Sequence, residues 1–238
     1  MNILITICAR GGSKGIPGKN IKLLNGKPLL HYTLDHARKF AEANSADIQI
    51  STDSEDILAC AAEMGYYTSY QRPPELGSDT AGKIDAIRNV WYWAENELGK
   101  KYDFVLDLDV TSPLRTQADL AEALSSILAE PRALNIFSVN PAVRNPYFNM
   151  VELSDDGFAR VSKSNQLIKS RQQAPKVFDM NASFYFFSRE FMEGEYSRST
   201  TDRSLIHVMK HVCFDLDEPI DFEVLEIMLR EKMLDFDI

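Results

Sequence analysis

Short apolar segments alternate with amphipathic helical segments along most of this 238-residue chain. The first, Asn2–Cys8, is an isoleucine-rich apolar run, which is typical of a strand buried on both faces. Helical spacing of apolar residues follows within Pro28–Ala43, and a second short strand is predicted at Asp47–Ser51. Strands that alternate with helices of this length predict an α/β fold with a Rossmann-like, mostly parallel sheet flanked by helices. Ligands bind such sheets beyond the carboxyl ends of the strands.

The alternation stops between Pro141 and Met180, where prolines, polar residues and the turn Asp155-Asp156-Gly157 replace it. We interpret residues 141–180 as an insertion in a single domain that spans residues 1–238.

Further helices and strands are predicted outside this insertion. Thr52 or Asp53 is expected to cap the helix that begins at Asp53. The other predicted helices and strands are the helices Asp53–Met64, Lys83–Leu98, Ala118–Leu128 and Pro219–Met233 and the strands Phe104–Val110, Ala133–Val139, Ser183–Phe187 and His207–Phe214.

Composition excludes some classes of partner. Apolar residues make up 45% of the chain and charged residues 26%, which is enough to bury a sizeable core. The net charge of −9 makes nucleic acid an unexpected partner, because nucleic-acid-binding proteins present basic faces to the phosphates. An acidic protein that binds a nucleotide must instead gather its positive charge locally.

Three cysteines, Cys8, Cys60 and Cys213, are odd in number and far apart, so they predict neither a disulfide framework nor a zinc site. His207 and His211 would share one face of a helix, but the surrounding residues are predicted to form a strand. No apolar stretch is long enough to span a bilayer. We expect a cytoplasmic protein without membrane contact.

Positive charge gathers in Arg10–Asn20, directly after the first predicted strand. This stretch combines one arginine and two lysines with four glycines. Glycine lets backbone N–H groups approach a phosphate closely, and the cations supply the charge that a triphosphate requires. The pattern matches neither a Walker loop nor G-x-G-x-x-G. A phosphate cradle is therefore predicted, and the alternative is a flexible turn with solvated lysines.

Two carboxylates, Asp215 and Asp217, flank Leu216 at the end of a predicted strand, where alternation places both on one face. Hard oxygen ligands at this spacing suit Mg²⁺. A solvated strand end is the alternative. Asp221 fits either a further ligand or a cap of the last helix.

Several motifs together resemble one known family, the CMP-sialic acid synthetases (N-acylneuraminate cytidylyltransferases) among the sugar nucleotidyltransferases. They occur in the family's order and cover nearly the whole chain. The motifs are ARGGSKGIPGKN from Ala9, STDSEDI from Ser51, RPPELGSDTAG from Arg72, TSPLRT from Thr111, SRQQAP from Ser170 and FDLDEPIDF from Phe214.

The resemblance implies a nucleotidyltransferase that joins CMP from CTP to the anomeric hydroxyl of a nine-carbon 2-keto sugar acid (N-acetylneuraminic, legionaminic or related), with Mg²⁺ or Mn²⁺, and releases pyrophosphate. It also implies a homodimer in which the inserted segment crosses to the partner and helps to complete its active site. Alternatives are the same fold acting on Kdo or another sugar such as a phosphorylated hexose, or a catalytically silent CTP-binding module.

Carried over position by position, the resemblance makes Arg10, Lys19, Asp215 and Asp217 catalytic, with Lys19 nearest the α-phosphate and the two aspartates as metal ligands. Arg72 and Ser78 would contact the cytosine, although Ser78, Asp79 or Thr80 could instead cap the following helix. The implied nucleotide-binding residues are Arg10, Gly11, Ser13, Lys14, Lys19, Asn20, Arg72 and Ser78.

For the sugar, the resemblance implies Arg171 as partner of the carboxylate and Tyr185 as an aromatic wall. Asp109-Val110 stands where the family has Gln-Pro, which suggests a different substituent on the sugar or a second metal contact. The segment Asp179–Tyr185 resembles relatives that act on legionaminic-type sugars, although a buried strand explains it equally well. The implied sugar-binding residues are Asp109, Arg171, Gln172, Asn181 and Tyr185.

Overall fold

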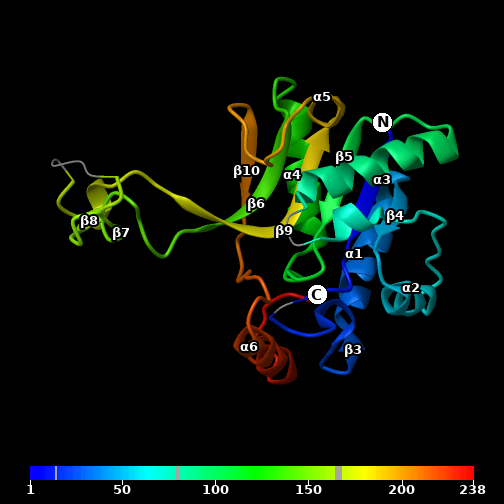
Figure 1. Ribbon diagram of the computed structural model, residues 1–238, viewed down its shortest axis with the longest axis horizontal. Coiled ribbons are helices and arrows are strands. Elements are labelled where there is room, and N and C mark those ends of the chain that lie inside the picture. The colour runs from blue at the N-terminus through cyan, green and yellow to red at the C-terminus, as the bar shows by residue number, and fades with distance from the viewer. Residues whose placement is uncertain (14, 79–80, 164–167) are drawn as a thin grey trace. The chain divides into compact units, whose positions relative to one another are not determined.

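In the computed structural model of this protein, the chain divides into two units, here called the main unit and the second unit (Figure 1). The main unit comprises Met1–Ser138 and Asn181–Ile238, and the second unit comprises Val139–Met180. The chain therefore leaves the main unit once and returns to it once. The residues that the structure describes are 1–13, 15–78, 81–163 and 168–238.

A six-stranded sheet forms the centre of the main unit, with the strand order β10-β6-β9-β5-β1-β4 (Figure 1). β1 is parallel to both β4 and β5, and β9 is antiparallel to β5. The parallel pairs need crossover helices, which the alternating sequence supplies. The predicted fold class, an α/β protein with a mostly parallel sheet, is confirmed. The strands are β1 (Ile3–Cys8), β4 (Asp47–Ser51), β5 (Phe104–Leu108), β6 (Asn135–Pro141), β9 (Phe178–Ser188) and β10 (Ser204–Val208).

Helices cover both faces of this sheet. Ile3, Ile5 and Ile7 of β1 belong to the buried core that α1 and α4 share. Because side chains alternate along a strand, Thr6 points to the opposite face, where α3 packs against β1 and β4. In the described part of the chain, no helix has both the length and the apolar character that crossing a membrane requires. The helices are α1 (Leu29–Asn44), α2 (Glu55–Ala62), α3 (Lys83–Leu98), α4 (Gln117–Ala129), α5 (Arg189–Glu193) and α6 (Pro219–Arg230).

The last predicted strand, His207–Phe214, is wrong in its bounds. β10 ends at Val208, and the residues from Met209 to Glu218 have no regular structure. Within this segment the backbone N–H of Leu216 donates a 2.8 Å hydrogen bond to the carbonyl of Thr111, which follows β5. This segment therefore pairs with a loop instead of extending β10.

The predicted cap of α2 is also wrong. Ser54, not Thr52 or Asp53, is the N-cap, and its hydroxyl accepts a hydrogen bond from the Ile57 N–H at 3.4 Å. The Asp53 carboxylate accepts instead from the backbone N–H of Gly11 at 2.7 Å. Asp53 therefore binds the loop after β1 and is not available to cap α2.

A hairpin in the N-terminal part of the chain lies next to the last helix, α6. After the short 3₁₀ helix η1 (Lys19–Ile21), strands β2 (Leu23–Leu24) and β3 (Lys27–Pro28) form a hairpin. Asn25 and Gly26 turn it with φ angles of 48° and 80°, as a two-residue hairpin of this kind requires. Figure 1 shows α6 beside this hairpin, and the N–H of Asn25 donates to Glu226 Oε1 at 3.3 Å.

The second unit is small and built around one hairpin. Strands β7 (Val151–Leu153) and β8 (Ala159–Val161) are antiparallel, and the 3₁₀ helix η3 (Arg171–Gln173) follows them. All three residues of β7 are exposed. Within this unit, Asn145 donates from Nδ2 to the carbonyl of Pro175 at 2.9 Å.

Candidate active site

The glycine-rich loop after β1 lies directly against the segment that carries Asp215 and Asp217. A Cβ atom at Gly15 would stand 2.4 Å from the carbonyl oxygen of Asp217, so only glycine permits this approach. The ammonium of Lys19 donates to the Leu216 carbonyl at 2.7 Å and lies 3.3 Å from Asp217 Oδ1. The Lys19 side chain is 13% exposed and that of Asp217 is 74% exposed. Two residues 198 positions apart, both predicted from sequence, are therefore brought together.

Internal hydrogen bonds shape the glycine-rich loop. Asn20 is buried, and its Nδ2 donates to the carbonyl of Arg10 at 2.9 Å. Gly11 is held by Asp53, while Arg10 and Ser13 are half-buried. Lys14, another predicted phosphate ligand, lies outside the described residues. Asn20 therefore fixes the backbone of the loop.

Asp215 has the environment of a carboxylate that would bind a cation. Its Oδ1 atom is buried and has no hydrogen-bond partner among the described residues. Burial, reinforced by the negative charge of Asp109 and to a lesser extent that of Asp217, raises the Asp215 pKa to about 7. An oxygen-preferring divalent cation next to Asp215 and Asp217 would offset both effects. The two aspartates therefore fit the predicted metal.

Asp221 is a helix cap. Its Oδ2 atom accepts hydrogen bonds from the backbone N–H groups of Asp217 at 3.0 Å and Glu218 at 2.7 Å. Glu218 and Asp221 together form a capping box at the start of α6. Of the two predicted roles of Asp221, the structure supports the cap, which also fixes the backbone of Asp217.

Lys83, the first residue of α3, forms a charged cluster that the sequence analysis missed. Its ammonium lies 2.8 Å from Asp109 Oδ2, 3.0 Å from Asp107 Oδ2 and 4.6 Å from the ring centroid of Tyr185. Asp107 is 1% exposed and also accepts from Thr6 Oγ1 at 2.8 Å. Burial works against the charge of Lys83, but the two carboxylates outweigh it and raise the Lys83 pKa. A buried aspartate needs a cation nearby. Asp107, in a predicted apolar strand, was therefore the signal in the sequence that a lysine or arginine must lie next to it.

Both oxygens of Asp109 are engaged within the protein. Oδ1 accepts from the backbone N–H and the hydroxyl of Thr111, each at 2.9 Å, and Oδ2 binds Lys83. Burial alone would raise the Asp109 pKa, but the charge of Lys83 and these hydrogen bonds hold it at about 2. Asp109 is therefore an ionised residue with a cation partner already in place.

A second missed residue, Arg115, joins the loop after β5 to β9. It is fully buried, donates from Nε to Ser183 Oγ at 3.0 Å and from Nη2 to the Ser112 carbonyl at 2.6 Å, and also contacts the Asp109 carbonyl. Asn181 is buried too, and its side-chain oxygen accepts from Ser138 Oγ at 2.5 Å. Arg115 therefore supports the backbone that presents Asp109, whereas Asn181 joins β9 to β6.

A cavity of about 570 Å³ opens beyond the carboxyl end of β4. Arg72 and Ser78, the predicted cytosine contacts, both line it. Arg72 is buried and donates from Nε and Nη2 to the hydroxyl and carbonyl of Ser51, at 2.9 and 2.7 Å. Ser78 donates to the Glu75 carbonyl at 2.9 Å, and the N-cap of α3 is Gly82. The cavity is lined by Thr52, Asp53, Ser54, Glu55, Leu58, Tyr70, Gln71, Arg72, Pro74, Gly77 and Ser78.

The remaining predicted sugar ligands divide between the units. Tyr185 is buried in β9 of the main unit, below the ammonium of Lys83. Arg171 and Gln172 belong to the second unit and are exposed in η3, where Arg171 Nη2 donates to the carbonyl of Val143.

Comparison with known proteins gives one consistent result. Residues 4–235 match the sequence model of a family described as cytidylyltransferase. The post-translational flagellin modification protein B of Campylobacter coli is 36% identical, over 98% of this chain and 97% of its own length. The CMP-N,N'-diacetyllegionaminic acid synthase of Campylobacter jejuni is 33% identical with the same coverage. A solved CMP:2-keto-3-deoxy-manno-octonic acid synthetase complexed with CTP superimposes with a TM-score of 0.70 at 15% identity, over 98% of this chain and 100% of that one.

Proposed function

This chain belongs to the cytidylyltransferase family, and we propose that it transfers CMP from CTP to the anomeric hydroxyl of a nine-carbon 2-keto sugar acid, with release of pyrophosphate. One observation carries the proposal: the Lys19 ammonium lies 2.7 Å from the Leu216 carbonyl and 3.3 Å from Asp217 Oδ1. The cationic glycine-rich loop and the pair of carboxylates thus lie next to each other. Nucleotidyl transfer needs both, because charge develops on the phosphate oxygens during the reaction.

The residues act by positioning and by neutralising charge. Arg10, Lys19 and the N–H groups of the glycine-rich loop bind the triphosphate, with Lys19 nearest the α-phosphate. Asp215 and Asp217 would hold a divalent cation, Mg²⁺ or Mn²⁺, which would supply a lower pKa for the attacking hydroxyl and positive charge next to the α-phosphate. Arg72 and Ser78 line the cavity of about 570 Å³ and contact the cytosine there. The chain needs no nucleophile of its own.

We propose a legionaminic-type acid as the preferred sugar. The C. jejuni relative, matched over nearly its full length, bears the name of a diacetyllegionaminic acid synthase. In place of the glutamine of the sialic acid enzymes, this chain carries Asp109 with Lys83 at 2.8 Å. The Lys83 ammonium donates to Asp109 and forms an ion pair with Asp107, and its three N–H groups leave at least one donor for a sugar oxygen. Lys83 then takes the contact that the glutamine would have made.

We also propose that two copies of the chain meet through the second unit. This unit exposes the apolar side chains of Val143, Val151, Leu153 and Phe158, a pattern typical of an interaction surface. The exposed Arg171 and Gln172 would then serve the sugar site of the partner. A fully active monomer in sedimentation measurements would contradict this proposal.

The deciding experiment incubates the protein with CTP, Mg²⁺ and single sugars, and identifies the products by mass. The sugars are diacetyllegionaminic acid, N-acetylneuraminic acid, Kdo and a phosphorylated hexose, and ATP, GTP and UTP replace CTP in parallel reactions. We expect CMP–nonulosonate and one pyrophosphate per product, with legionaminic acid the fastest substrate. Exclusive use of Kdo or a hexose phosphate would overturn the sugar assignment. CTP binding without any product would favour the silent module.

A further inference from the structure

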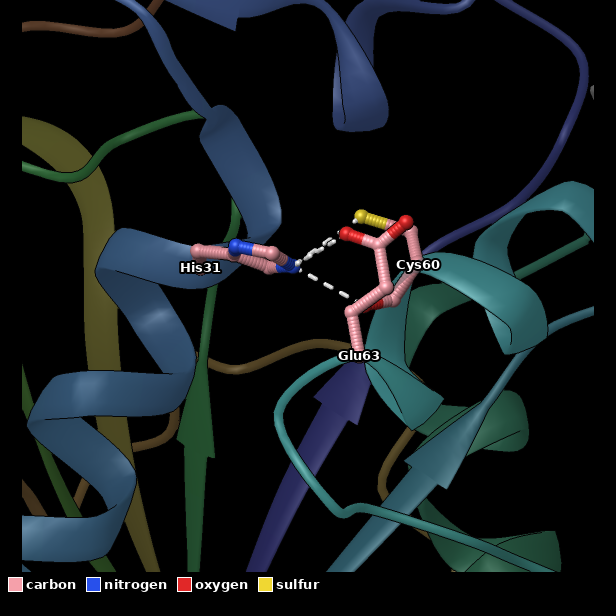
Figure 2. Close-up of side chains that lie close together, drawn as sticks. All are labelled: His31, Cys60 and Glu63. Atoms are coloured by element: carbon pink, nitrogen blue, oxygen red, sulfur yellow. Dashed lines mark hydrogen bonds and ion pairs between the residues drawn. The ribbon is translucent and has the colours of Figure 1, made fainter.

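Three potential metal ligands converge where α1 meets α2, and none of them belongs to the candidate active site. His31 projects from α1, while Cys60 lies on α2 and Glu63 directly follows that helix (Figure 2). The Nε2 atom of His31 is 3.3 Å from Cys60 Sγ and 3.7 Å from Glu63 Oε2. One ligand atom from each residue falls within 4.8 Å of the other two.

These separations are those of ligands around one small cation. Zinc binds nitrogen and oxygen at ~2.0–2.2 Å and sulfur at ~2.3 Å, so two of its tetrahedral ligands stand roughly 3.4–3.6 Å apart. The observed 3.3 Å and 3.7 Å bracket this spacing. Cys60 and Glu63 are three residues apart, which places them on one face of the helical segment, toward His31. Binding an ion at Nε2 requires the His31 ring to turn from the Cys60 carbonyl, which it contacts at 2.8 Å.

We propose that His31, Cys60 and Glu63 bind a thiophilic divalent cation such as Zn²⁺ or Co²⁺, with water completing the tetrahedron. The ligand set of one imidazole, one thiolate and one carboxylate is typical of zinc and disfavours Mg²⁺, which takes oxygen ligands. This site is therefore separate from the Mg²⁺ or Mn²⁺ that Asp215 and Asp217 are proposed to hold. It also does not depend on the proposed reaction.

Binding has a defined proton balance. In the structure His31 Nε2 lies 2.8 Å from the Cys60 carbonyl oxygen and so carries its proton there. On binding, this imidazole proton moves to Nδ1, and the thiol proton of Cys60 is released to solvent. Burial, with a contribution from the charge of Glu63, raises the Cys60 pKa to about 11, so only a cation with strong affinity for sulfur displaces that proton. The exposed Glu63 side chain provides the approach from solvent.

A bound ion would join α1 to α2. The N-cap of α2, Ser54, lines the 570 Å³ cavity, and its neighbour Asp53 holds Gly11 of the phosphate loop. The proposed ion would therefore stabilise the helix that supports one wall of the nucleotide site. At saturating zinc we expect the thermal midpoint to rise by about 5 °C.

The test uses the full chain, freed of metals with a chelator and titrated with Co²⁺ without Mg²⁺. We expect one tightly bound Co²⁺ per chain with thiolate-to-cobalt charge-transfer absorption and tetrahedral visible bands that Zn²⁺ abolishes, whereas Co²⁺ on Asp215 and Asp217 would add no charge-transfer band. Cys60→Ser should lose the charge-transfer band, whereas His31→Gln and Glu63→Gln should weaken binding at least tenfold. Cys213→Ser, which removes another buried thiol, is the matched control and should leave the titration unchanged.

Folding is checked separately by circular dichroism and by CTP binding. If Cys60→Ser folds poorly, the His31→Gln and Glu63→Gln variants decide the matter, because both substitutions keep the size of the side chain. The proposal is overturned if the wild-type chain gives no charge-transfer band, if the band survives Cys60→Ser in a folded protein, or if His31→Gln binds Co²⁺ as tightly as the wild type.

Discussion

The main unit buries its apolar side chains, whereas the second unit leaves several of them exposed. In the main unit, β1 is buried along almost its whole length and belongs to one continuous core with α1 and α4. In the second unit, β7 is exposed along its whole length, and Leu153 and Phe158 are 78% and 69% exposed. A two-stranded hairpin is marginally stable by itself. The main unit thus contains its own core, whereas the second unit needs a cover, which we propose is a second copy.

The two units also differ in whether their charged side chains are buried or exposed. The main unit buries Asp107, Arg115 and Glu95, and each lies beside groups of opposite charge or hydrogen-bond partners. The ion pair of the second unit between Arg160 and Asp156 lies at the surface, where such pairs contribute little to stability. Substitutions at these buried charged residues should therefore be costly, whereas substitutions of the exposed pair in the second unit should be mild.

The largest expected effect is on turnover. Lys19→Ala removes the cation nearest the proposed α-phosphate, and we expect a rate of pyrophosphate release about 10²–10³-fold below that of the wild type. The thermal midpoint should fall only slightly by comparison, because the variant loses one hydrogen bond to the Leu216 carbonyl and an ion pair with the exposed Asp217. Lys39→Ala, an exposed lysine of α1, is the matched control. Turnover of Lys19→Ala close to that of the control would remove Lys19 from the mechanism.

The next effect is on folding of the main unit. Lys83→Met leaves Asp107 buried without its cation, so we expect the free energy of unfolding to fall by about 3 kcal/mol. Asp107→Asn in the same chain should recover part of the loss, and urea titrations of the two single variants and the double variant measure this coupling. Lys83→Arg keeps the charge and should retain most of the stability but lower the apparent affinity for the sugar. Additive effects of Lys83→Met and Asp107→Asn would argue against a direct pair.

A smaller effect depends on pH. His211 Nε2 lies 2.8 Å from Asp119 Oδ2, and His207 Nε2 lies 3.2 Å from Oδ1 of the same carboxylate. Burial works against the protonated form of His211, but the hydrogen bond to Asp119 outweighs it and raises the His211 pKa. The stabilisation is therefore complete below the unfolded pKa of about 6.5 and disappears as pH rises through the folded value.

Accordingly, His211→Gln should lower the free energy of unfolding by about 1.5–3 kcal/mol near pH 5.5, and by clearly less near pH 8.5. Asp119 stays ionised at both values, because its pKa is lowered by hydrogen bonds from both histidines and from Thr116 despite its burial. Urea unfolding at the two pH values provides the measurement. An equal loss at both would mean that His211 acts by packing alone.

The smallest effect on folding is expected in the second unit. Leu153→Asp should leave the free energy of unfolding within about 0.5 kcal/mol of the wild type, since exposed positions tolerate such changes. The same substitution should shift the protein toward monomer in sedimentation experiments, because it places a charge in the proposed contact. Tyr67→Asp, an 81% exposed aromatic of the main unit, is the control. Equal association of both variants would place the contact elsewhere.

Local patterns were sufficient for most of the architecture. The predicted helix Lys83–Leu98 is α3 with the same bounds, and the strand Asp47–Ser51 is β4. Both elements are specified by apolar spacing within a few turns or residues. The predicted strand His207–Phe214 was wrong because its backbone partner, Thr111, lies about one hundred residues away. No periodicity within the segment reveals such a bond.

The sequence by itself determined the α/β class, the glycine-rich loop from Arg10 to Asn20 and the Asp215-Leu216-Asp217 pattern. Each of these features depends on residues that are close together in the sequence. Only the tertiary structure placed Lys83 against Asp107 and Asp109, buried Arg115 between the loop after β5 and Ser183, and set His31 opposite Cys60. Charge pairs and ligand clusters depend on distances between separate elements. Those distances follow from how the helices pack on the sheet, which local spacing does not encode.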